Sequence, residues 1–237
     1  MTIADNIRSI RERMARAALA AGRKPEEVIL VGASKMNGAA ACREAVAAGI
    51  DALGENRVQE MTEKLAQHAY DGAPVHFIGH LQRNKVRQVV GNVSLIHSAG
   101  SLELLEEIDR QAKKRGLVQD VLLEVNIGRE PSKSGFDPDA LFDAAARARE
   151  FEAVRVLGLM AIPPAAEEPH GNFRYFEKVC RLSVDIAENL YDNGFEYLSM
   201  GMSDDFEDAI AAGANMVRVG SAIFGHRPYQ TTTGGFT

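Results

Sequence analysis

The stretch LVGASKMNGAA, from Leu30 to Ala40, decides the fold because it reads as one strand that turns into a helix. The apolar run begins at Val28 and ends at Ser34-Lys35, after which a glycine and alanines follow. A short apolar run that ends in a turn and leads into a helical pattern is typical of a βα unit. The fold therefore depends on how many such units the chain contains.

Seven further apolar runs follow, separated by helix-like segments such as ACREAVAAG and LELLEEIDRQAKKRG. Eight βα units in about 200 residues predict an α/β fold, a single closed (β/α)8 TIM-type barrel that forms one domain over residues 1–237. The predicted strands are VILVGA from Val28, ALGE from Ala52, VHFIGH from Val75, SLIHSA from Ser94, VLLEVNI from Val121, VRVLGLMAI from Val154, EYLSMG from Glu196 and MVRVG from Met216.

An open, doubly wound sheet is the alternative fold, but the glycine-rich first turn GxGxxG that accompanies it is absent from the sequence. Ile3, Ile7, Ile10 and Met14 recur at helical spacing and predict an extra amphipathic helix before the first strand. We expect residues 231–237, which have the sequence TTTGGFT, to form a frayed tail.

The composition of the chain argues against several classes of binding partner. The net charge of −6 argues against a nucleic-acid-binding protein, and no apolar run approaches the roughly 18 residues of a membrane span. The only two cysteines, Cys42 and Cys180, lie in helical patterns and provide neither a disulfide framework nor a metal-ligand cluster. We therefore expect a cytoplasmic protein that binds no nucleic acid, no membrane and no metal. We also expect it to be a monomer.

Residues at the carboxyl ends of the predicted strands are the candidate site, because the chemistry of this fold gathers there. Gly201, Ser203 and the pair Gly220-Ser221 suggest a phosphate cradle of backbone N–H groups and hydroxyls after strands seven and eight. Ser203 is also a candidate N-cap for the helix through Asp204-Asp205-Phe206, and the alternative is that both serines only cap helices. The strand-end residues are Ser34, Lys35, Gly54, Glu55, Asn56, His80, Asn126, Ser199, Met200, Gly201, Met202, Ser203, Arg218, Gly220 and Ser221.

Lys35 and Arg218 fall on the first and last strands, which are neighbours in a closed barrel. Lys35 would face the phosphate cradle, either as a counter-charge or as a Schiff base with an aldehyde cofactor, unless its amine simply extends into solvent. Arg218 interrupts an apolar strand, and it either makes a structural ion pair or donates to a ring nitrogen of a cofactor. His76 and His80 are about 13 Å apart along a strand and cannot share a metal, so we predict that His76 is a packing residue.

On these residues the sequence resembles the pyridoxal phosphate (PLP) homeostasis protein family, whose single barrel is similar to the N-terminal domain of alanine racemase. The resemblance runs through most of the chain. Its motifs are VGASK ending at Lys35, GENRVQE from Gly54, HFIGHLQRNKV from His76, LLEVNIGREPSKSGF from Leu122, GLMAIPP from Gly158 and LSMGMSDDFEDAIAAGANMVRVGSAIFG from Leu198.

The resemblance implies PLP as the cofactor, with an internal aldimine at Lys35. It places Asn56 beside the cofactor, Arg218 at the pyridine nitrogen, and Gly220 with Ser221 at the phosphate. Ser199, Met200 and Ser203 would form the side of the site contributed by strand seven. None of these residues is implied to be catalytic.

Two departures from the family pattern stand near the predicted site. SKMNG, from Ser34 to Gly38, replaces the common SKTKP, so Asn37 takes the place of a second lysine. Any transfer of the cofactor through that second lysine is therefore in doubt, and Lys133 in SKSG is another candidate amine. Ser221 stands where the family often has threonine, which keeps the hydroxyl.

The function implied by the resemblance is a PLP carrier in intracellular PLP homeostasis, which holds the cofactor and releases it to apo-enzymes. The alternative is a weak PLP-dependent amino-acid racemase. Racemases with this barrel add a β-domain, which we do not expect here, and a cationic Arg218 opposes protonation of the pyridine and weakens the ring as an electron sink. A phosphosugar isomerase on an unmodified barrel is a third, weaker possibility.

Overall fold

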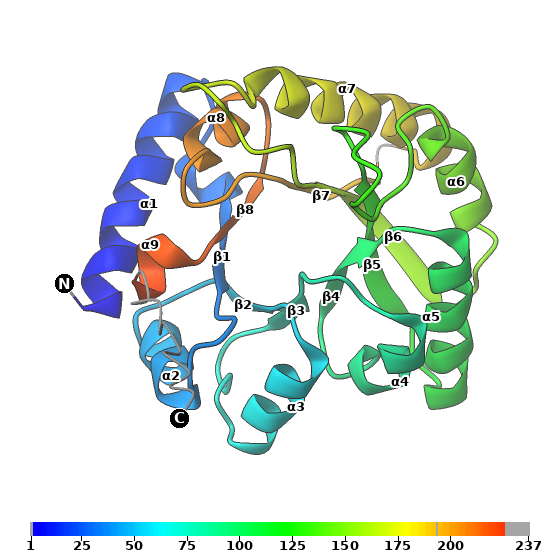
Figure 1. Cartoon of the computed structure of the whole chain (residues 1–237), viewed down its shortest axis with the longest axis horizontal. Helices are drawn as coiled ribbons and strands as arrows, with labels where there is room; N and C mark the ends of the chain where they lie inside the picture. Colours follow the sequence, from blue (N-terminus) through cyan, green and yellow to red (C-terminus); the bar gives the residue numbers. More distant parts are fainter. Residues whose placement is uncertain (1, 193, 226–237) are drawn as a thin grey trace, which may run out of the picture.

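Eight parallel strands close into a barrel in the order in which they occur along the chain (Figure 1). The computed structural model describes residues 2–192 and 194–225. Each of the eight predicted apolar runs overlaps one strand, with β5 beginning before its run at Gln119, so the predicted TIM-type barrel is confirmed. The strands are β1 (Ile29–Ala33), β2 (Ala52–Glu55), β3 (Val75–Phe77), β4 (Leu95–Ala99), β5 (Gln119–Val125), β6 (Val154–Ala161), β7 (Tyr197–Ser199) and β8 (Met216–Val219).

Helices surround the barrel and alternate with the strands. The prediction of one domain over residues 1–237 stays a prediction, and the expected frayed tail at 231–237 lies outside the described residues. The helices are α1 (Ile3–Ala20), α2 (Ala39–Ala47), α3 (Val58–Ala66), α4 (Val86–Val89), α5 (Leu102–Arg115), α6 (Leu141–Ala148), α7 (Phe173–Leu190), α8 (Phe206–Ala211) and α9 (Ser221–Phe224), with 3-10 turns η1 (Pro25–Glu27) and η2 (Arg83–Lys85).

The N-terminal helix α1 is the extra helix that the isoleucine spacing predicts. Thr2 caps it, because the Thr2 side chain accepts from the Asp5 N–H while the Asp5 carboxylate accepts from the Thr2 N–H. Its apolar face, which includes Ile7, Ile10 and Met14, is buried against α8 and α9 (Figure 1). Since α9 follows β8 directly, α1 covers the barrel where its last strand meets its first.

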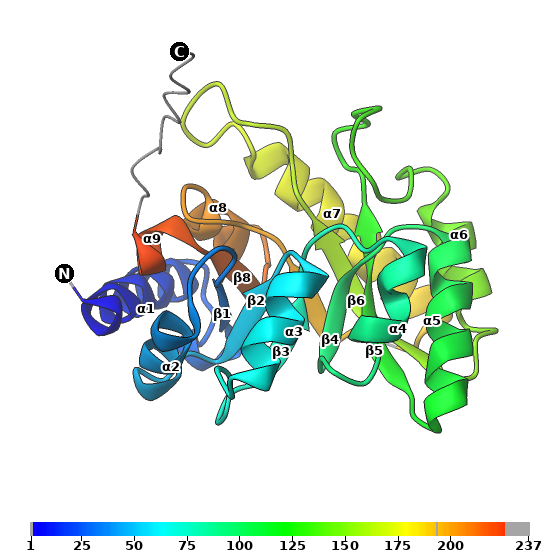
Figure 2. The ribbon, with the colours of Figure 1, turned by 60° about the horizontal axis from the view of Figure 1, so that its bottom comes forward.

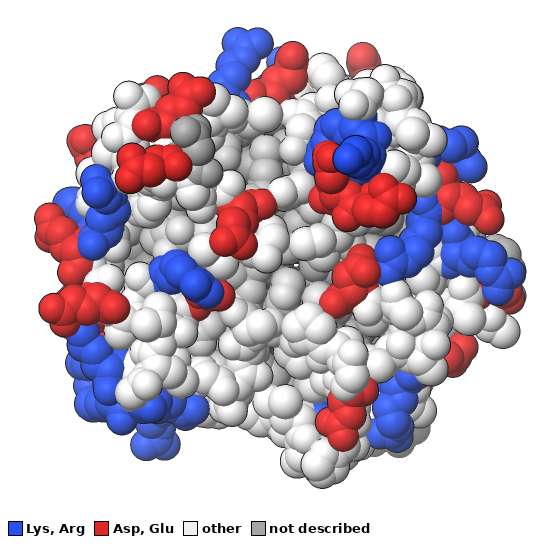
Figure 3. All heavy atoms as spheres, turned by 180° about the vertical axis from the view of Figure 1, so that it is seen from behind, with Lys and Arg blue, Asp and Glu red and all other residues white. Residues whose placement is uncertain are grey.

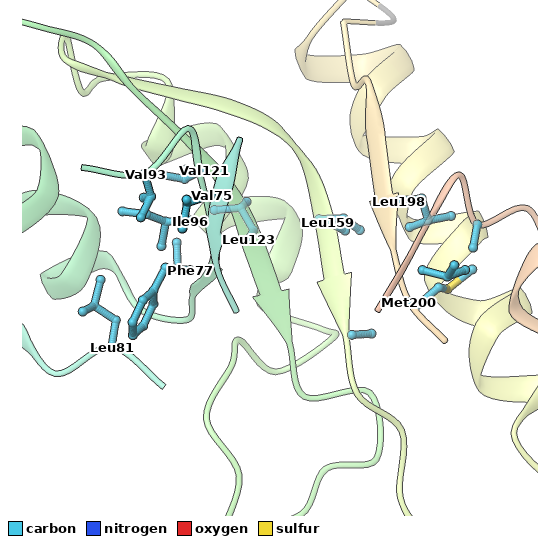
Figure 4. Packing of buried hydrophobic residues seen from close by; sticks show 14 of the residues in the cluster. Val75, Phe77, Leu81, Val93, Ile96, Val121, Leu123, Leu159, Leu198 and Met200 are labelled. Carbon is cyan, nitrogen blue, oxygen red and sulfur yellow. The ribbon is translucent and has the colours of Figure 1, made fainter. Parts of the chain in front are cut away.

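Two apolar layers arise from the alternation of side chains along the strands. The outward-facing residues pack against the helices, as Figure 4 shows for Phe77, Leu123, Leu159 and Leu198. The inward-facing residues of the second layer fill the inside of the barrel: Val31, Ala52, Leu95, Leu122, Leu157, Met160 and Met216. Polar side chains follow above this inner layer, toward the carboxyl ends of the strands.

Gly79, just after β3, permits a close approach between two segments of the barrel mouth. A Cβ atom at Gly79 would lie 2.2 Å from the backbone oxygen of Asn56. Only glycine fits this contact without moving the backbone. Gly79 therefore helps to position Asn56, which is one of the predicted site residues.

Three observations concern the outside of the molecule. The loops after β5 and β6 extend beyond the barrel at the end where the strands finish (Figure 2). On the face seen in Figure 3, basic and acidic side chains are interspersed around the rim and the centre is mostly uncharged. In the described part of the chain, no helix combines the length and the apolar character that a membrane crossing requires.

Candidate functional site

Lys35 stands at the mouth of the barrel, in the turn that follows β1. Val31 of β1 faces the interior, and the alternation of side chains predicts the same inner face for Lys35. Val31 pairs with Arg218 of β8, so Lys35 and Arg218 belong to neighbouring strands. The Lys35 side chain is exposed, and no carboxylate among the described residues pairs with it.

Two residues of α3 hold the turn that carries Lys35. The Lys64 ammonium donates to the backbone oxygen of Ser34 at 2.8 Å, and the Glu60 carboxylate accepts from the Met36 N–H at 2.6 Å. Met36 has a φ of 61°, a left-handed backbone conformation that is uncommon for residues other than glycine, asparagine and aspartate. The backbone on both sides of Lys35 is thus bound to one face of α3.

The Lys64 ammonium also belongs to a buried ion pair behind the mouth. Its Nζ lies 2.6 Å from Glu55 Oε1, which accepts further hydrogen bonds from the Ser34 hydroxyl at 2.5 Å and the Tyr70 hydroxyl at 3.0 Å. Burial and the adjacent Glu55 carboxylate raise the pKa of Tyr70. Breaking such a pair would leave a buried charge without its partner, so the cluster stabilises this turn of β1.

Arg218 is buried inside the barrel without a carboxylate partner. It is 4% exposed, and its guanidinium donates to Ser199 Oγ at 2.5 Å and to the Ala161 backbone oxygen at 3.0 Å. The structural ion pair considered as an alternative is absent among residues 2–192 and 194–225. Burial lowers the pKa of Arg218 to about 10, so it remains a cation at neutral pH. Its charge is therefore not balanced by a direct contact with a carboxylate of the described residues.

A chain of hydrogen bonds continues from Arg218 across the barrel interior. Ser199 Oγ lies 3.0 Å from His97 Nδ1, and His97 Nε2 lies 3.0 Å from His76 Nδ1. Burial lowers the pKa of His76 to about 4 and holds the pKa of His97 well below its usual range. His76 is buried against the His97 ring, as expected of a packing residue, but the prediction did not include its place at the end of a buried polar chain.

Ser203 forms a cradle with the start of α9. Its hydroxyl oxygen accepts from the Ser221 hydroxyl at 3.1 Å and receives longer contacts from the Gly220 N–H at 3.4 Å and the Ala222 N–H at 3.5 Å. Three donors converge on one oxygen, which is the arrangement that binds an oxyanion. The predicted N-cap role of Ser203 is wrong, because α8 has Asp205 at its N-cap position.

Gly201 permits the chain to enter this cradle. Its φ is +90°, and a Cβ atom there would lie 2.6 Å from the Cβ of Ala209. Met200, which precedes it, points the other way. The Met200 side chain is fully buried in the outer layer beside Leu198 (Figure 4), so only its backbone can face the mouth.

Asn56 lines a cavity of about 390 Å³ on the other side of the mouth, together with His80, Glu124, Asn126 and Lys133. The Asn56 side-chain oxygen is buried and has no hydrogen-bond partner among the described residues. Burial raises the pKa of Glu124. The Lys133 ammonium donates to the Pro163 backbone oxygen at 3.1 Å and pairs with Glu130.

The structure brings most of the predicted residues to one end of the barrel. Strand ends, or the turns that follow them, carry Lys35, Asn56, Ser199, Arg218 and the cradle.

Sequence reasoning missed His97 and Glu124. Each is a polar residue at an inward position of an apolar strand, in SLIHSA and VLLEV, and that interruption is the signal that could have found them.

Comparison with known proteins gives one consistent result. The family model described as "Alanine racemase, N-terminal domain" matches residues 2–228. The pyridoxal phosphate homeostasis protein of Aquifex aeolicus is 42% identical over 97% of this chain and 100% of its own length, and that of Pseudomonas aeruginosa is 41% identical over 96% and 97%. The PipY protein of Synechococcus elongatus, solved with PLP bound, is 32% identical with a TM-score of 0.80 over 94% of this chain and 100% of its own.

Stability should depend on pH through His76. An unfolded histidine binds a proton near its ordinary pKa of 6.5, but folded His76 binds one only near 4, so stability is present above pH 6.5 and is lost as pH falls toward 4. The difference corresponds to about 3 kcal/mol. In urea unfolding at pH 7 and pH 4.5, His76→Gln should lose less stability on acidification than the wild type. An equal loss in both proteins would contradict the buried, neutral state of His76.

Proposed function

The chain belongs to the pyridoxal phosphate homeostasis protein family, and from that membership we propose that it binds PLP at the mouth of its barrel and serves as an intracellular carrier of the cofactor. In this role it holds PLP at Lys35 and releases it to apo-enzymes. A cytoplasmic location and a monomeric state belong to the same proposal. The observation that carries it is a buried Arg218 on β8, free of carboxylate partners among the described residues, together with an exposed Lys35 in the turn after the neighbouring strand β1.

The residues at the mouth fit PLP. The cradle of Ser203, Gly220 and Ser221 offers converging donors for a phosphate, and Arg218 offers a buried cation for the acceptor nitrogen of a pyridine. When bound, PLP supplies an aldehyde carbon that is open to attack by a primary amine. Lys35 supplies that amine, and Asn56 has a free side-chain oxygen near the end of the adjacent strand β2.

Lys35 should be the residue that binds the cofactor covalently. Lys35→Ala should lose the visible absorbance of the protein mixed with PLP, since no amine then remains at the end of β1. The matched control is Lys133→Ala, which removes an amine from the opposite side of the mouth and should keep the band. A band that persists in Lys35→Ala and disappears in Lys133→Ala would move the covalent site to Lys133.

The cradle should select the phosphate. The double variant Ser203→Ala, Ser221→Ala removes two hydroxyls from the converging donors. It should weaken PLP binding by about 1–3 kcal/mol, the usual range for hydrogen bonds to charged groups, and leave the binding of pyridoxal nearly unchanged. Binding is measured by titration, with Ser134→Ala at the other side of the mouth as control. Equal losses for both ligands would exclude the cradle as the phosphate site.

A carrier role, rather than catalysis, is supported by the accessibility of Lys35. Lys35 is exposed and Met36 beside it is 54% exposed, so water and a second protein can reach the amine. Efficient PLP enzymes exclude water from their reacting groups. A cation at Arg218 also opposes protonation of the pyridine, which reduces the capacity of the ring to accept electrons from a substrate carbanion.

The PLP-loaded protein should therefore exchange the α-proton of amino acids slowly. In deuterated water, NMR should show α-proton loss from alanine well below about 1 s⁻¹, the lower limit of ordinary enzyme turnover. The same protein should restore activity to an apo-aminotransferase. Exchange at or above about 1 s⁻¹ would favour the alternative, a PLP-dependent racemase.

A further inference from the structure

The guanidinium of Arg218 is held by a hydroxyl where a carboxylate would be the usual partner. Ser199 and Arg218 are 0% and 4% exposed, and the bond between them joins β7 to β8 inside the barrel. A serine hydroxyl rotates freely, so by itself it would hold the guanidinium weakly. The acceptor of the Ser199 hydroxyl proton therefore decides how firmly Arg218 is oriented.

The chemistry of the donors gives the chain of hydrogen bonds one direction. Arginine has only donors, so Ser199 Oγ accepts from Arg218. The Ser199 proton then points to His97 Nδ1, which is 3.0 Å away and must be unprotonated. His97 consequently carries its proton on Nε2 and donates it to His76 Nδ1 at 3.0 Å. Both histidines are thus neutral Nε2–H tautomers.

Hydrogen bonds that run in the opposite direction, from His97 to Ser199, would leave the Ser199 hydroxyl proton without an acceptor. If His97 donated to Ser199 through Nδ1, the Ser199 hydroxyl would accept two bonds and its own proton would have no acceptor among the described residues. A buried donor without a partner costs about 1–3 kcal/mol. The forward direction satisfies every proton along the chain as far as His76.

The histidines also leave the charge of Arg218 uncompensated. His97 and His76 are buried at 0% and 7% exposure, and the carboxylates that act on Arg218 are Asp205 and Glu124, neither of which pairs with the guanidinium. The groups that act on His97 are His76 and Arg218 itself. A neutral imidazole chain orients the cation without neutralising it. A carboxylate in the same place would orient it but would also take up its charge.

We propose that His97 and His76 are positioning residues that, acting through Ser199, orient Arg218 toward the ring nitrogen of bound PLP. This inference rests on the proposed function for its ligand, although the order of the hydrogen bonds does not. The chain of hydrogen bonds crosses the barrel from β8 and β7 to β4 and β3. Residues on β3 and β4 therefore support the guanidinium that β8 contributes on the other side of the barrel.

The first test concerns the protein without PLP. In ¹⁵N NMR of the whole chain at pH 7, the ring nitrogens of His97 and His76 should show neutral Nε2–H tautomers with Nδ1 as acceptor. A protonated Nδ1 on His97, or a cationic His97, would overturn the proposal. Because no cofactor is present, this result is independent of whether the protein binds PLP.

The second test compares PLP with a phosphorylated benzaldehyde analogue in which C–H replaces the ring nitrogen. His97→Leu should bind PLP on the order of tenfold more weakly, and it should bind the analogue as the wild type does. Ser199→Ala interrupts the chain one step earlier and should give the same pattern, which keeps the test valid if His97→Leu fails to fold. His97→Asn retains an acceptor close to Ser199 and should recover most of the affinity for PLP.

Ile96→Ala is the matched control, since Ile96 precedes His97 on β4 but faces the outer layer. It should lower stability and leave the ratio of the two affinities unchanged. Equal weakening of both ligands in His97→Leu and Ser199→Ala, or no weakening of either, would overturn the positioning role. Failure of the wild type to bind PLP would instead refute the proposed function and leave the NMR result standing.

Discussion

The buried charge of Arg218 is the constraint on which the inside of this barrel depends. A guanidinium that loses water inside a protein must recover hydrogen bonds, and in this barrel it recovers them from a hydroxyl and a backbone oxygen. That need accounts for the polar side chains across the upper interior, where Ser199, His97 and His76 replace the apolar residues of the layer below. The barrel is therefore packed with apolar side chains at one end and prepared for a polar ligand at the other.

Outside the barrel, a second buried charge serves the same end of the molecule. The pair of Lys64 and Glu55 is enclosed between α3 and the end of β2, and it holds Ser34, the residue before Lys35. Glu60, one helical turn before Lys64, holds Met36 on the other side. Among the described residues, the inner chain and this outer clamp share no hydrogen bond. One holds the guanidinium of β8 and the other holds the backbone turn that carries Lys35, so two independent supports act on neighbouring strands.

The fold was predictable because its signal is local. Eight apolar runs of strand length separated by helical segments can arrange themselves in few ways, and the end of the first run places Lys35 at the mouth of the barrel. The roles of His76, His97 and Ser203 were not predictable in this way. The contacts of His76 and His97 cross the barrel interior, between β3, β4 and β7, and depend on the stagger of strands that a single strand does not reveal.

Ser203 and Met200 also lie differently from what the sequence and its family resemblance imply. Ser203 binds the start of α9 and not the start of α8, because Gly201 turns the chain toward β8 before the helix begins. Met200 lies between two site residues in the sequence, but one step along a strand reverses its side chain, and it packs with Leu198 outside the barrel. Nearness in the sequence to a ligand motif therefore does not establish that a side chain touches the ligand.

The geometry of the mouth connects tight recognition with release. A carrier has to recognise the phosphate and the ring strongly enough to hold a reactive aldehyde, yet it must leave the covalent bond open to an incoming amine. In the proposed site these tasks fall on different residues: Arg218, proposed to recognise the ring, is 4% exposed, whereas Lys35, proposed to supply the amine, is exposed beside Met36. Bonds made by buried groups are protected from water, while a bond at an exposed amine is within reach of another amine. An enzyme would enclose both, and the combination of an exposed Lys35 with an enclosed Arg218 fits the proposal of a protein that transfers its ligand.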